Sequence, residues 1–188
     1  MDENTKKLIE KAQVKDTLEQ EYKLTLEERI NRHLELKPHG IVAGSHFAPV
    51  SAECHLLYRD GHFYGTISLA QAVAEALAKF LCNKNGWKPK KDFENNIQQL
   101  EKRGKITNEL STLFTKVWKN RDDYHHLNPQ IEQDRQKLWV LAKNKLTDLR
   151  KIEQEIFAYT INNGKLVPRY PKYWDLKNGT VPVYLRFD

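Results

Sequence analysis

One segment, KNRDDYHHLNP at residues 119–129, holds the side chains whose types and spacing could do chemistry. Arg121 carries a planar guanidinium that matches the oxygens of a phosphate and in practice never loses its proton. His125 and His126 follow it, and an imidazole titrates near neutrality, so either could take up or give a proton. An arginine and a histidine without a metal-ligand spacing beside them are suited to metal-independent cleavage of RNA.

In that reaction the arginine would hold the scissile phosphate and stabilise its growing negative charge. A histidine would take the proton of the 2′-hydroxyl, donate one to the leaving oxygen, or do both. DNA lacks this internal nucleophile, so the substrate would have to be RNA. A structural role for the same residues stays open. Arg121 could pair with Asp122 or Asp123, and the histidines could favour the partial negative charge at the C-terminus of a helix.

The segment resembles the signature of HEPN domains (higher eukaryotes and prokaryotes nucleotide-binding), in which an arginine is followed, after four to six residues, by a histidine. The arginine often has a polar Asn, Asp or His directly after it. Arg121 falls on the arginine of the pattern, Asp122 on its polar neighbour and His126 on its histidine, at the shortest spacing. His125 is one residue too close to fit. The likeness covers roughly residues 68–160.

The resemblance implies an α-helical domain that forms a homodimer, with the motifs of two protomers meeting in a cleft. It implies a metal-independent endoribonuclease of a toxin–antitoxin or phage-defence system, with RNA as substrate and an antitoxin or another defence protein as a possible partner. Catalytic residues would be Arg121, His126, Asp122 and His125, and RNA-binding residues would be Asp123, Tyr124, Lys119 and Asn120. No metal or cofactor is expected.

Other HEPN domains have lost activity and serve as RNA- or nucleotide-binding or protein-interaction modules. Asp122 stands where Asn is more frequent in the family, and a carboxylate beside an RNA phosphate would repel it. An inactive binding module is therefore the alternative. A third possibility is a scaffold or antitoxin-like protein whose groove receives a helix of its partner.

The choice of histidine depends on helix geometry. On an ideal helix Arg121 and His125 lie about 40° apart, whereas Arg121 and His126 lie about 140° apart. The assignment to His126 therefore requires the helix to loosen before Asn128-Pro129, where the proline biases residue 128 away from helical conformation.

The elements that must position the segment follow from apolar spacing. One helix is predicted over residues 108–126, with Leu110, Phe114 and Val117 in its stripe. The stripe continues to Arg121, Asp122 and His125, so the core-facing side becomes ionic in the last turn. Burying such groups costs several kcal/mol unless they are paired or hydrated. The pattern therefore predicts a cleft or a contact with another chain.

The rest of the chain is predicted to be mainly helical. Further helices are expected over residues 6–36, from Ser68 to about 85, from Asp92 to about 103 and from Asn128 to Asn163. Residues 40–50 are expected to form a loop. A β-hairpin is predicted where CHLLYR and HFYGTI flank Asp60-Gly61. The tail after Gly164 is rich in proline and aromatics, with a turn at Asn178-Gly179 and VPVYLRF as an edge strand.

The predicted fold is thus an antiparallel helical bundle with three parts. Residues 1–66 would form an N-terminal helix and the small β-hairpin, residues 67–164 the HEPN-like bundle, and residues 165–188 an ordered tail packed on it. A length of 188 residues suits one domain with an appendage.

Charge and composition narrow the classes of partner and compartment. Residues 1–65 hold 9 Lys/Arg against 11 Asp/Glu, and residues 66–188 hold 22 against 14. The basic part is compatible with a polyanion such as RNA, and equally with a solvated lysine-rich surface. The most apolar stretch, residues 68–82, contains Gln71, Glu75 and Lys79 and is too short to cross a bilayer. With two cysteines and no signal peptide, a cytoplasmic protein without a membrane span is expected.

Overall fold

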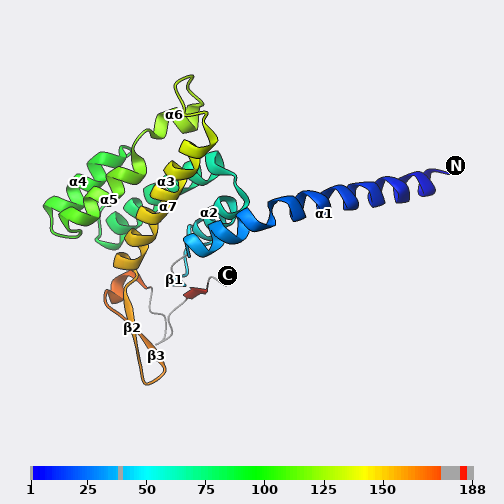
Figure 1. The fold of residues 1–188 in the computed structure, drawn as a ribbon. Coiled ribbons are helices and arrows are strands. Elements are labelled where there is room, and N and C mark those ends of the chain that lie inside the picture. The colour runs from blue at the N-terminus through cyan, green and yellow to red at the C-terminus, as the bar shows by residue number, and fades with distance from the viewer. Residues whose placement is uncertain (1, 38–39, 175–182, 186–188) are drawn as a thin grey trace. The chain divides into compact units, whose positions relative to one another are not determined.

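The computed structural model describes residues 2–37, 40–174 and 183–185 of the chain. Residues 1–35 and residues 36–188 form two compact units. The first unit is one helix, α1 (Glu3–Glu35), as predicted for residues 6–36 (Figure 1).

The second unit is a helical bundle with two small antiparallel sheets. Its helices are α2 (Ala48–Asp60), α3 (Phe63–Lys84), α4 (Phe93–Lys102), α5 (Asn108–Trp118), α6 (Arg121–His126) and α7 (Arg135–Ile156). One sheet pairs β2 (Tyr159–Asn162) with β3 (Lys165–Pro168), and the other pairs β1 (Ile41–Ala43) with β4 (Val183–Leu185). A short 3-10 helix, η1 (Pro171–Tyr173), follows β3.

The central helix of the bundle is α3, which packs against α2, α4, α5, α6 and α7. Eleven of its residues are buried, because apolar side chains recur around most of its circumference. By length and composition alone α3 could cross a membrane, but 56% of its most apolar window is buried inside the bundle. The core helix of a folded domain has the same character, so α3 is weak evidence for a membrane span.

Three helices of the second unit begin at side-chain caps that satisfy backbone N–H groups of the first turn. Asp92 accepts a hydrogen bond from the Asn95 amide at 2.7 Å, Thr107 from the Leu110 amide at 3.2 Å, and Asp134 from the Lys137 amide at 2.9 Å. These caps fix where α4, α5 and α7 start.

The β-hairpin predicted at Asp60-Gly61 is wrong, because both flanking segments are helices. In the segment before the turn, Ser51, Cys54 and Tyr58 are buried at helical steps of three and four. Gly61 has φ 83° and ends α2 as a left-handed C-cap, donating its amide to Tyr58 O at 3.1 Å. A glycine with positive φ serves a helix end as well as a hairpin turn.

The last long helix is shorter than the predicted span of residues 128–163. It begins at Arg135 rather than Pro129 and ends at Ile156. Asn163 and Gly164, predicted as its end, have φ 48° and 73° and form the two-residue turn between β2 and β3.

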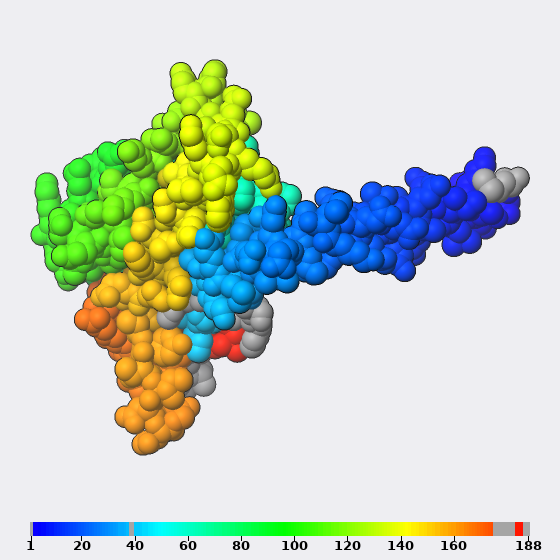
Figure 2. Space-filling model, viewed as in Figure 1, coloured from blue at the N-terminus to red at the C-terminus, as the bar shows by residue number. Residues whose placement is uncertain are grey.

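Both ends of the second unit also differ in detail from the prediction. Residues 41–43, predicted as loop, form β1 and pair with β4, which lies inside the predicted VPVYLRF strand. The predicted turn at Asn178-Gly179 lies outside the described residues. Tyr173 and Trp174 are buried, and the Trp174 ring meets Phe157 edge-on at 5.8 Å. In this unit α6 lies at one end of the bundle and the β2–β3 hairpin at the other (Figure 2).

Candidate functional site

The predicted single helix over residues 108–126 is wrong, since it breaks between Trp118 and Arg121. Asn120 has φ 61°, a left-handed conformation that asparagine tolerates better than most residues. It separates α5 from α6 and changes the direction of the chain. The ionic residues after the break therefore do not continue the apolar stripe of α5.

Buried donors hold the break in place. Lys145 on α7 is 3% exposed, and its ammonium donates to the carbonyl oxygens of Val117 and Lys119, each at 2.7 Å, and more weakly to Lys116 at 3.4 Å. Gln71 on α3 donates its amide to the carbonyls of Trp118 and Lys119 at 3.3 and 3.2 Å. The terminal carbonyls of a helix lack partners within the helix, so these two side chains stabilise the C-terminus of α5. We call Lys145 and Gln71 together the clamp.

Burial changes the protonation equilibrium of Lys145. It lowers the pKa of Lys145 to about 8 from an ordinary value of 10.5, while the nearby Asp148 acts in the opposite direction. At neutral pH the group is still mostly an ammonium, whose three N–H bonds match three carbonyl acceptors.

The roles of Lys145 and Gln71 at the end of α5 were not predicted from the sequence, although the position of Lys145 in the apolar stripe of its helix was a signal. The apolar stripe of α7 runs through Leu138, Ala142 and Leu149, and Lys145 occupies the position where that stripe has a gap of seven residues. A lysine at a core position must reach acceptors, and a helix C-terminus is a natural partner.

Arg121 begins α6 with its guanidinium partly exposed. Its Nη1 donates to Asp122 Oδ1 at 2.9 Å, and its Cζ lies 5.5 Å from the ring centre of Trp118. Its buried Nε has no hydrogen-bond partner among the described residues. The hydrogen bond from Arg121 lowers the pKa of Asp122, and the nearby histidines add a smaller effect. Arg121 therefore has an exposed carboxylate in the position where a phosphate could bind.

The two histidines lie at the other end of the same short helix, and both are exposed. Helix α6 stays regular through His126 and ends at Leu127, with φ 51°. The loosening required for His126 to share a face with Arg121 thus comes only after it. Within one subunit, the helix spacing places His125, and not His126, on the face of Arg121.

Partial burial of the imidazole lowers the pKa of His125 below its usual 6.5, and the charge of Arg121 adds to this. A hydrogen bond with the Ser68 backbone and the carboxylate of Glu75 oppose the decrease. His125 is therefore mostly neutral at pH 7, which is the form that accepts a proton.

We expect NMR titration to find the pKa of His125 below 6.5 and to find it raised in Arg121→Gln, because one positive neighbour is then gone. The measurement follows the imidazole carbon-bound protons of both proteins between pH 5 and 8. A pKa above 6.5 in the wild type, or no change in the variant, would contradict this electrostatic description.

The remaining predicted residues differ in what they contact. Tyr124 is 5% exposed, and its ring lies 6.3 Å from that of Tyr64 on α3, so it attaches α6 to the bundle. Asp123 accepts a hydrogen bond from Asn128 at 3.0 Å and orders the loop after α6. Lys119 and Asn120 are exposed.

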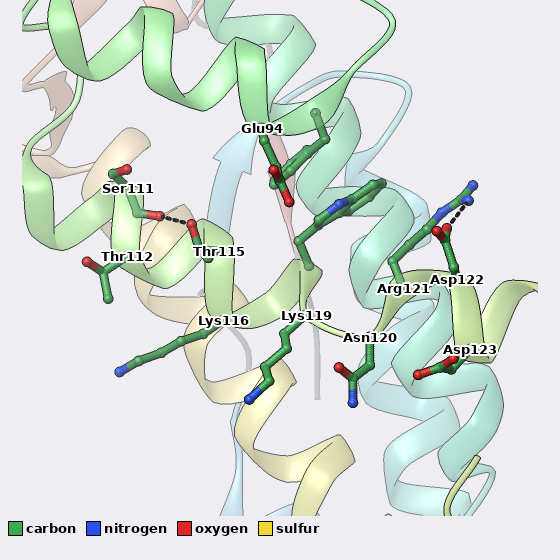
Figure 3. Close-up of a pocket in the computed structure, with 12 residues that line it drawn as sticks. Glu94, Ser111, Thr112, Thr115, Lys116, Lys119, Asn120, Arg121, Asp122 and Asp123 are labelled. Carbon is green, nitrogen blue, oxygen red and sulfur yellow. Dashed lines mark hydrogen bonds and ion pairs between the residues drawn. The ribbon is translucent and has the colours of Figure 1, made fainter. Parts of the chain in front are cut away.

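A cavity of about 550 Å³ opens beside the start of α6 (Figure 3). Residues of α4, of α5 and of the turn into α6 line it, and the Trp118 indole stacks on Phe93 at 4.2 Å between ring centres. Its charged side chains are three cations and three carboxylates: Lys116, Lys119, Arg121, Glu94, Asp122 and Asp123. The cavity is therefore electrostatically balanced, with Arg121 and its paired Asp122 at one side.

Other candidate chemistry has less support within the described residues. They hold no group of three or more His, Cys, Asp or Glu side chains that could bind a metal. Cys54 and Cys82 are buried, and burial raises the pKa of the Cys82 thiol, which disfavours the reactive thiolate.

Comparisons of the chain with family models, with curated proteins and with solved structures gave no match. The interpretation of the site therefore depends on its own geometry and on the resemblance of its motif.

Proposed function

We propose that this protein is a metal-independent endoribonuclease of the HEPN type, acting through Arg121 and the histidines of α6. The observation that carries the proposal is the grouping on one short, exposed helix of a guanidinium and two imidazoles, beside a cavity of about 550 Å³. A guanidinium and an imidazole are the groups that RNA cleavage without a metal requires.

In the proposed reaction a neutral imidazole removes the proton of the 2′-hydroxyl, and the 2′-oxygen attacks the adjacent phosphorus. The bond from phosphorus to the 5′-oxygen breaks, and that oxygen takes up a proton from an imidazolium. The products are a 2′,3′-cyclic phosphate and a 5′-hydroxyl end. Arg121 would lie against the non-bridging oxygens, where negative charge increases.

The lowered pKa of His125 suits the base, and His126 is the histidine that the family pattern names. Through a homodimer, as the resemblance implies, the groups of two subunits would share one cleft. A role in a toxin–antitoxin or phage-defence system, and a cytoplasmic location, belong to the same proposal.

The Arg121–Asp122 ion pair favours a second candidate, an inactive module that binds RNA or a partner protein. A phosphate that binds Arg121 must displace or share the carboxylate. In that case the same surface would bind RNA with a steep salt dependence but leave it intact.

The test is incubation of the protein with tRNA or total RNA in excess EDTA, followed by analysis of the new ends. We expect fragments with 2′,3′-cyclic phosphates. A synthetic RNA with a single 2′-deoxy substitution at a mapped site should resist cleavage there, because the nucleophile is absent. If the wild type leaves all RNA intact, or cuts the substituted site equally well, the nuclease proposal fails.

A further inference from the structure

Helix α1 carries a row of six large apolar side chains, of which five are exposed to solvent and Leu26 is half-buried. The members recur at every fourth position: Val14, Leu18, Tyr22, Leu26, Ile30 and Leu34. Leu18 is 58% exposed and Leu34 is 64% exposed, and Arg32 is the one buried residue of the helix. We call these six residues the α1 stripe.

A helix with such a stripe normally packs it against another element, since most helical stability in proteins comes from burying an apolar face. The stripe covers 20 residue steps, or about 30 Å of helix axis. A groove of about 460 Å³ runs beside Val14, Leu18 and Tyr22. A contiguous apolar surface of this length is typical of an interaction site.

The spacing of the stripe indicates which kind of element fits. Side chains at i and i+4 form a ridge, and interdigitation of two such ridges is the commonest class of helix–helix packing. A second helix with the same ridge would therefore fit the stripe, crossing it at an angle of about 50°.

Charges beside the stripe make it complementary to itself. On one flank the charges along the middle of the stripe alternate in sign: Lys15, Glu19, Lys23 and Glu27. On the other flank Glu21 precedes Arg29 and His33. In an antiparallel pair that crosses near residue 21, Lys15 would face Glu27 of the second copy and Glu19 would face its Lys23.

We propose that α1 is a self-association helix that binds α1 of a second copy of this chain through the α1 stripe. The apolar ridge supplies the contact, and the alternating flanks select a second copy over a partner of uniform charge. The proposal does not depend on the nuclease proposal, because it concerns α1 alone.

The test compares two variants of the full chain by light scattering and sedimentation over a range of concentrations. One is Leu18→Gln combined with Tyr22→Gln, which removes two adjacent members of the stripe while keeping a good helix former. The matched control is Leu24→Gln, because Leu24 is 85% exposed but lies about 160° around the helix from Tyr22.

We expect the wild type and Leu24→Gln to have a mass near twice 22.1 kDa. The dissociation constant of the double variant should rise roughly a hundred-fold, because four apolar contacts are lost per pair of subunits. A cysteine at position 22 should also be joined across subunits by a short bismaleimide, and a cysteine at position 24 should not.

A wild type that is monomeric throughout the range would overturn the proposal, as would a double variant that dissociates no more readily than Leu24→Gln. The readout is association rather than RNA cleavage, and the cross-link at position 22 distinguishes association through α1 from a dimer that meets at the α6 motifs. An inactive protein that self-associates, or an active one that does not, therefore separates the two proposals.

Discussion

Replacement of Lys145 by methionine lowers the free energy of unfolding by about 2–4 kcal/mol, because it removes the ammonium donor from the Val117 carbonyl and leaves the Lys119 carbonyl with Gln71 alone. Methionine matches the length of the side chain but cannot donate. The loss of the buried ammonium offsets part of the cost, since its desolvation is unfavourable. Urea denaturation of the two proteins, followed by circular dichroism, measures the difference.

Two controls separate the clamp from a general effect of removing a lysine. Lys137→Met, at a side chain that is 71% exposed on the same helix, should change the free energy of unfolding by less than about 0.5 kcal/mol. Lys145→Gln, which keeps two N–H donors, should fall between the wild type and Lys145→Met. Equal stability of all four proteins would mean that the clamp does not stabilise the fold.

Because the pKa of Lys145 is lowered in the folded protein, the free energy of unfolding should depend on pH in a direction that can be derived. Lys145 has a pKa of about 8 in the folded protein and close to 10.5 when unfolded. Between these values the unfolded chain binds more protons, so the free energy of unfolding contributed by this group increases as the pH rises. The wild type should therefore gain stability relative to Lys145→Met between pH 8 and 10.5.

Lys145 also shows why the sequence predicted the helices better than their ends. The apolar stripe of α3 follows from side-chain spacing that burial enforces directly, and residues 6–36 form a helix although their stripe is mostly exposed. The break at Asn120 depends on donors 26 residues and more away in the chain, on α7 and α3. The spacing of neighbouring residues cannot predict that contact, so the stripe of α5 was predicted to extend into the ionic segment.

The two turns were predicted wrongly for a different reason. An Asp-Gly or Asn-Gly pair can either end a helix or form the turn of a β-hairpin. Asp60-Gly61 was predicted as a hairpin turn and ends a helix, whereas Asn163-Gly164 was predicted as a helix end and is a hairpin turn. In both places the chain needs a positive φ, and only the flanking burial distinguishes them. Steps of three and four before Gly61 indicated a helix.

If Arg121 holds the scissile phosphate, Arg121→Ala should lower the rate of RNA cleavage by about 10²–10³-fold without changing the free energy of unfolding by more than about 0.5 kcal/mol. Its guanidinium is partly exposed, and it forms an ion pair with the neighbouring exposed carboxylate of Asp122. Arg121→Lys should retain less than full activity, because an ammonium cannot form a bidentate contact. Cleavage of a labelled RNA under single-turnover conditions provides the rates.

Replacement of the neighbouring Asp122 should change the rate of RNA cleavage in the opposite direction. Asp122→Asn removes the carboxylate that competes with phosphate for Arg121 and restores the residue that is more frequent in the family pattern. Tighter RNA binding with faster cleavage is therefore expected. Slower cleavage would instead assign Asp122 a part in the reaction, for example in orienting a histidine.

The histidines decide whether one subunit or two build the site. If the catalytic base acts on the face of its own Arg121, His125→Ala should abolish most activity and His126→Ala little, since α6 is regular through both. If instead the arginine of one subunit works with the histidine of another, His126→Ala should be the more damaging. An equal mixture of Arg121→Ala and His126→Ala would then recover activity in mixed dimers, because their shared cleft still holds one intact arginine and, from the other subunit, one intact histidine. Recovery would locate the reaction between subunits, and its absence with an inactive His125→Ala would place it on one helix.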